Sequence, residues 1–157
     1  MPNRDIYMLR HEATIVTAIT ALQIKAGANY GFEILGWEVS QKGSTTSASE
    51  SMAWVRKSGA ATVTTAVAGT HLFRATDTPA ADLSLGTTAT GVVGSAEGTD
   101  ADIIHKFGFN VLSGYSRQLL LEERALFRCK LGEIIALKFL TAPATQLWQF
   151  NVVLMEI

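Results

Sequence analysis

The chain has little of what builds covalent or metal-held scaffolds. Its single cysteine, Cys129, excludes an internal disulfide and a cysteine-rich zinc site, and it is compatible with assembly in a reducing cytoplasm. The three histidines, His11, His71 and His105, lie too far apart in the chain to place two ligands on one strand or helix. We therefore predict no metal site and no cofactor.

Charge is also scarce. Charged residues make up 17% of the chain, against about 25% in an ordinary soluble domain, and the net charge is −1. No long run of one sign is present, so we predict that neither nucleic acid nor an anionic membrane is a partner. The many uncharged residues indicate that part of the surface is covered by other copies or by another protein, which predicts a homo-oligomer.

Long hydrophobic runs are missing as well. The apolar stretches at 134–137 and 152–155 are far shorter than the roughly 20 residues that span a bilayer. Residues 1–11 carry charges and lack the apolar stretch of a secretory signal. We expect a soluble protein without a signal peptide.

What the chain does have is a series of short strand-like segments separated by turn signals. This pattern predicts an all-β fold, a single jelly roll or related β-sandwich formed by one domain over residues 1–157. Segment 118–131 is ambiguous between a helix and two strands joined by a turn at Glu122–Arg124, and we favour the strands. The expected strands lie at about 18–25, 32–41, 51–57, 60–66, 103–112, 117–121, 133–140 and 147–155.

An Ala/Thr/Gly-rich excursion interrupts this series at about 67–102, and it carries no Lys or Arg from Ala75 to Ile104. We predict a long anionic loop or contact arm here, with short unplaced strands as the alternative. The expected interface residues are Asp77, Asp82, Asp100, Asp102 and Trp54.

No catalytic constellation is present in the sequence, so we predict that the protein is not an enzyme. Glu122 and Glu123 are adjacent, and on a strand they would point to opposite faces. The three tryptophans, Trp37, Trp54 and Trp148, are expected to pack in the core, with sugar stacking as the alternative. Cys129 lies between two basic residues, but a buried, inert thiol is favoured over a reactive one.

Several short motifs together resemble a family of small proteins encoded among the structural genes of tailed bacteriophages and prophages. These motifs are Gly86–Gly91, Gly108–Leu112 with Gly114, Glu122–Arg124, Ile135–Leu137, Ala142–Pro143, and the loop 43–49 followed by Val55–Lys57. The resemblance implies a virion protein assembled in the host cytoplasm, of the head decoration (cement) type with a jelly-roll-like fold. Its partner would be the major capsid protein, and a homotrimer is favoured. The alternatives are a tail or baseplate module that binds host glycan and a barrel that holds a small apolar ligand.

Overall fold

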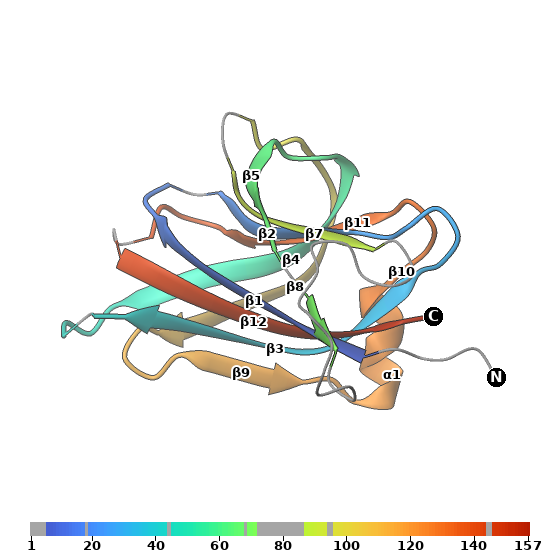
Figure 1. Cartoon of the computed structure of the whole chain (residues 1–157). Coiled ribbons are helices and arrows are strands. Elements are labelled where there is room, and N and C mark those ends of the chain that lie inside the picture. The colour runs from blue at the N-terminus through green and yellow to red at the C-terminus, as the bar shows by residue number, and fades with distance from the viewer. Residues whose placement is uncertain are drawn as a thin grey trace.

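The computed structural model describes residues 6–17, 19–43, 45–67, 69–71, 87–93, 96–143 and 146–157, which form two antiparallel sheets packed face to face (Figure 1). Sheet A contains β1 (Ile6–Ile15), β3 (Phe32–Lys42), β6 (Gly69–His71), β9 (Tyr115–Gln118), β10 (Arg128–Cys129) and β12 (Gln146–Glu156). Sheet B contains β2 (Thr20–Lys25), β4 (Ser49–Gly59), β5 (Val63–Ala66), β7 (Thr88–Val93), β8 (Thr99–Asn110) and β11 (Ile134–Phe139). The helical segments are α1 (Leu121–Arg124) and a turn of 3-10 helix (Ala125–Phe127).

The strand order confirms the all-β, jelly-roll prediction. Four antiparallel pairs are nested along the chain: β1 with β12, β2 with β11, β3 with β9, and β4 with β8. The pairs alternate between the two sheets, giving the order β9-β3-β12-β1 in sheet A and β2-β11-β4-β8 in sheet B. This is the winding of a jelly roll, in which one long antiparallel ribbon is wrapped into a two-sheet sandwich.

The core lies between the sheets and is rich in aromatic rings. The indole of Trp37 on β3 meets that of Trp54 on β4 edge to face, with ring centroids 5.6 Å apart, and Trp148 packs on Phe139 at 4.9 Å. All three tryptophans are buried, which confirms the expected core packing. Trp54 is 0% exposed, so its selection as an interface residue was wrong. Its large apolar ring contributes most to the stability of the fold when it is removed from water, which is why it lies in the core.

Segment 118–131 differs from the predicted pair of strands. β9 and β10 are present but short, and the expected turn between them is the helical turn of α1 followed by the 3-10 turn. The carboxylate of Glu123 accepts a hydrogen bond from the backbone N–H of Leu120 (3.0 Å), as in the reciprocal half of a capping box. This local cap satisfies a free donor at the start of a helical turn, so the alternating pattern ends there.

The Ala/Thr/Gly-rich excursion is largely part of the sandwich where it is described. β6 pairs with β1 and β7 pairs with β2, so the two strands extend sheets A and B along the same edge, and β5 continues sheet B beyond β7. Gly91 on β7 lets the strand approach sheet A, since a Cβ there would lie 2.3 Å from Nε2 of His11. Of the two alternatives for 67–102, short strands rather than a free arm are therefore observed in the described part of the segment, and Asp77 and Asp82 lie outside the described residues.

No helical segment in the described part of the chain is long and apolar enough to cross a membrane.

Candidate functional site

Two of the predicted interface acids lie on β8. Asp100 is engaged within the chain: its carboxylate accepts hydrogen bonds from Nζ of Lys57 (2.8 Å) and of Lys138 (2.7 Å). Partial burial opposes ionisation of Asp100, but the hydrogen bonds from Lys138 and Lys57 outweigh it and lower the pKa of this carboxyl. Asp102 lies exposed, opposite Arg56 in the register of β4 and β8. The Asp100 carboxylate is therefore paired with lysines of its own chain, whereas an interface residue was expected to be free to pair with a partner.

The segments around Asp100 cover the outer face of sheet B. Ala53, Val55 and Ala136 form a small buried cluster separate from the main core. The chain at 61–62 and 96–97 crosses near them: Ala61 N–H donates to Oε1 of Gln23 (2.8 Å), and Thr62 N–H donates to the carbonyl of Ala96 (2.8 Å). Small side chains on this face let a covering segment approach closely.

A different feature, at the end of the sandwich that holds α1, has the character of a contact site. Figure 1 shows α1 near the C-terminus, while the turn between β8 and β9 lies at the opposite end. Leu119 and Phe127 are buried on either side of the helical segment. Between them Leu120, Leu121 and Leu126 are 68%, 76% and 61% exposed. We call these three residues the leucine corner.

Side-chain contacts hold the leucine corner in place. Phe127 packs against Trp37 with ring centroids 5.3 Å apart. Arg56 on β4 donates from Nη2 to the carbonyls of Leu126 (3.1 Å) and Arg128 (2.8 Å), which ties the 3-10 turn to sheet B. Arg124 donates from Nε to the carbonyl of Leu119 (3.2 Å). The exposed leucines therefore belong to a segment that is anchored from both sheets.

Beside the leucine corner, polar contacts connect β8, β9 and α1. Arg117 on β9 places Nη2 at 2.5 Å from the carboxylate of Glu123 and Nη1 at 3.0 Å from Nε2 of His105 on β8. Because arginine only donates, Nε2 of His105 is the acceptor and the imidazole is neutral. Burial and then the charge of Arg117 lower the pKa of His105, and hydrogen bonds from the Leu120 backbone and from Arg117 lower the pKa of Glu123. The result is a fixed Glu123 that caps α1.

No protein-family model matches the chain, and neither a curated protein nor a solved structure does. Within the described ranges, no group of three or more His, Cys, Asp or Glu side chains is placed to hold a metal ion.

The leucine corner was within reach of the sequence, although the sequence analysis did not select it. Residues 119–121 are three consecutive leucines, and a strand can direct only alternate side chains to the core. At least one of the three thus had to face away from the core. The signal was weakened because the same segment was expected to be a strand, in which a single outward leucine is unremarkable.

Cys129 is the buried thiol that was expected. Its residue is 0% exposed, and burial raises the pKa of the thiol to about 12, with Arg56 acting in the opposite direction. At pH 8 so small a thiolate fraction should slow reaction with a disulfide reagent such as DTNB by about 1,000-fold or more relative to an ordinary thiol of pKa about 8.5. Absorbance at 412 nm should show slow release of thionitrobenzoate when DTNB reacts with the native protein and immediate release when the protein is in denaturant. Fast labelling of native protein would contradict this.

His11 is buried against Phe150, with ring centroids 6.2 Å apart, and its Nε2 has no hydrogen-bond partner among the described residues. Burial lowers its pKa. On acidification below about pH 6.5 the unfolded chain then takes up a proton before the folded one, so stability present above that pH should be lost, by up to about 1.4 kcal/mol per pH unit.

Urea unfolding between pH 7 and pH 5 measures this loss. In the His11→Gln variant the free energy of unfolding should depend less steeply on pH. The His105→Gln variant is the comparison: its dependence should also become shallower, because burial and Arg117 lower the pKa of His105 too. An unchanged slope in His11→Gln would show that His11 titrates normally in the fold.

Proposed function

We propose that the chain is a non-enzymatic structural protein that attaches to a larger protein assembly through the leucine corner. In the terms of the resemblance above, it is a head decoration protein that binds the major capsid protein of a tailed phage. The observation that carries the proposal is the exposure of Leu120, Leu121 and Leu126 on an anchored segment.

Physical cost and benefit support a contact role. Burying a fully exposed leucine side chain contributes about 1.5–3 kcal/mol, so three leucines can supply several kcal/mol to an association. Because the segment is already held by Arg56, Arg124 and Phe127, little conformational entropy remains to be lost on binding. Hydrophobic anchors near one another on a rigid element are typical of the residues that dominate interface energies.

The glycan-binding alternative loses the feature that suggested it. Trp37, Trp54 and Trp148 are all buried between the sheets, so none offers an open ring face to a sugar. We therefore retain protein–protein attachment as the proposed function.

Electron cryo-microscopy of virions produced from the genome that encodes this chain tests the proposal. The expected result is jelly-roll density on the head, with the α1 end of each copy against the shell. Particles without this density, or with the α1 end facing solvent, would contradict it.

Self-association is proposed with the attachment, because the chain has few charges to cover its surface. Multi-angle light scattering at micromolar concentration should give a mass three times that of the chain, which is 16.9 kDa. A monomer mass that rises only in the presence of shells would restrict assembly to the particle surface. A monomer mass under both conditions would contradict the trimer and leave attachment as a property of the single chain.

A further inference from the structure

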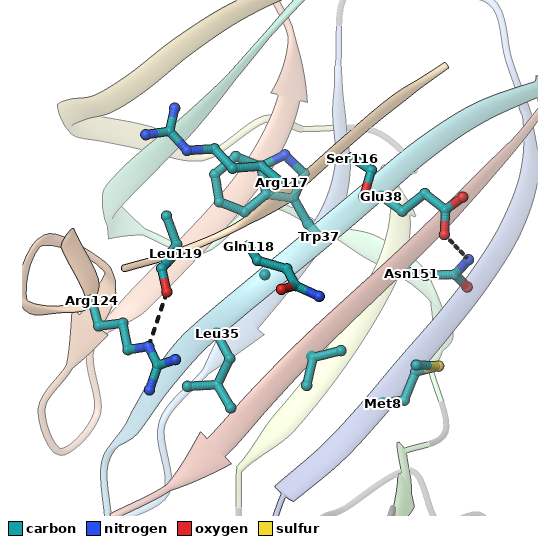
Figure 2. Close-up of a pocket in the computed structure, with 12 residues that line it drawn as sticks. Met8, Leu35, Trp37, Glu38, Ser116, Arg117, Gln118, Leu119, Arg124 and Asn151 are labelled. Atoms are coloured by element: carbon teal, nitrogen blue, oxygen red, sulfur yellow. Dashed lines mark hydrogen bonds between the residues drawn. The ribbon is translucent and has the colours of Figure 1, made fainter. Parts of the chain in front are cut away.

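The outer face of sheet A carries a groove that begins beside the leucine corner, where Leu121 borders its first hollow, and continues away from it along the strands. Three adjoining hollows follow this face: Arg124 borders the first and the second, while Met8, Glu38 and Asn151 border the second and the third. The middle hollow, drawn in Figure 2, has a volume of about 300 Å³, which is at the lower limit for small-molecule sites. The sheet-A groove, as we call these three hollows, is therefore elongated and shallow.

The middle hollow of the groove has aliphatic side chains at its centre and opposite charges at its two ends. Met8, Leu35 and Val153 line the middle hollow. Arg124 stands at the α1 end, where its Nε–H bond to the Leu119 carbonyl fixes the guanidinium, as Figure 2 shows.

The opposite end of the middle hollow is acidic. The exposed Glu38 accepts a hydrogen bond from Nδ2 of Asn151 (3.3 Å). In the described part of the chain no carboxylate pairs with Arg124 and no lysine or arginine pairs with Glu38. Both charges are thus available to a ligand.

We propose that the sheet-A groove binds an extended segment of a partner protein, with an acidic side chain on Arg124, an aliphatic side chain in the middle hollow and a basic side chain near Glu38. Alternate side chains of an extended chain point the same way and lie about 7 Å apart. Leu35 and Glu38 lie on the same face of β3 because the strand bulges at Leu35, opposite Val153 and Leu154. A basic residue two positions from the aliphatic one lies about 7 Å away, and its long side chain covers the remaining distance to Glu38, so the pattern to test is acidic-x-aliphatic-x-basic.

A peptide fits this groove better than a sugar does. The ring of Trp37, the aromatic residue that borders the middle hollow, is turned into the core, where it meets Trp54. The hollow therefore offers aliphatic rather than aromatic surface. The inference rests on the proposed function only in that the partner is a protein.

Fluorescence polarisation with labelled peptides tests the inference. The probes are ETLTK and its reverse KTLTE, because the groove fixes the order of charges but not the chain direction. We expect one of them to bind with a dissociation constant below about 1 mM. Arg124→Glu should weaken that peptide at least tenfold and should restore binding of KTLTK, in which the acidic residue is replaced by lysine.

The control is Lys106→Glu, which reverses an exposed charge on β8 of the other sheet and should leave peptide binding unchanged. Binding of neither peptide, or binding that Arg124→Glu leaves intact, would overturn the inference. Binding of an acidic sugar, trigalacturonic acid, without binding of either peptide would also overturn it. If the peptides fail while attachment to particles still depends on the leucine corner, only the groove is overturned and the proposed function stands.

Discussion

Replacing Leu120 and Leu121 together by glutamate should reduce attachment to the particle by about 100-fold or more. Two leucines removed from water contribute about 3–6 kcal/mol, and each 1.4 kcal/mol corresponds to a factor of ten in affinity. Two carboxylates placed in an apolar contact add a desolvation cost in the same direction. Co-sedimentation of the purified variant with shells that lack the protein measures the loss directly.

The matched control is Leu112→Glu in the turn between β8 and β9. Leu112 is 55% exposed, close to the exposure of the corner residues, but it lies at the opposite end of the sandwich. The control should bind as the unchanged protein does. Both variants should keep their unfolding temperature, because the altered side chains face solvent and the anchors Leu119 and Phe127 remain. Equal loss in both, or in neither, would contradict the leucine corner as the attachment site.

The all-β architecture was predictable because its signals are local. Phe32–Lys42 and Ser49–Gly59 are rich in apolar residues on both faces, are bounded by glycine- and serine-rich turns, and pair in the structure with long partners. The jelly-roll winding itself depends on which distant strands pair, and only the number and spacing of the strands indicated it.

The candidate site was less accessible to sequence reasoning because it depends on tertiary contacts. Whether 118–131 is helical is decided by the hydrogen bond from Leu120 N–H to Glu123 and by the burial of Phe127, neither of which periodicity reveals. The anionic character of 67–102 was real in the sequence, but Asp100 meets two lysines that lie far from it in the chain. A run of acids without nearby cations resembles a free surface until the fold brings the cations to it.

Because Asp100 is paired within its own chain, we predict that Asp100 and its neighbour Glu97 stabilise the fold rather than contact a partner. The Lys57 side chain is 0% exposed, and its Nζ lies 2.8 Å from the Asp100 carboxylate, 3.9 Å from that of Glu97 and 2.6 Å from the Glu97 carbonyl. The double variant Glu97→Gln/Asp100→Asn leaves this buried ammonium without a counter-charge, a change that costs about 3–5 kcal/mol in buried pairs. We expect the lower value, since both carboxylates are about one third exposed.

For a chain of this length, about 3 kcal/mol corresponds to a fall of roughly 6–12 °C in unfolding temperature, which differential scanning calorimetry resolves. Adding Lys57→Met to the double variant should recover most of the loss, because an apolar chain of similar size needs no counter-charge. Asp102→Asn, an exposed acid on the same strand, should change little and controls for the removal of negative charge. If the double variant instead keeps its unfolding temperature and loses attachment to particles, Glu97 and Asp100 are contact residues, as the sequence first suggested for Asp100. Attachment would then run through the excursion rather than through the leucine corner.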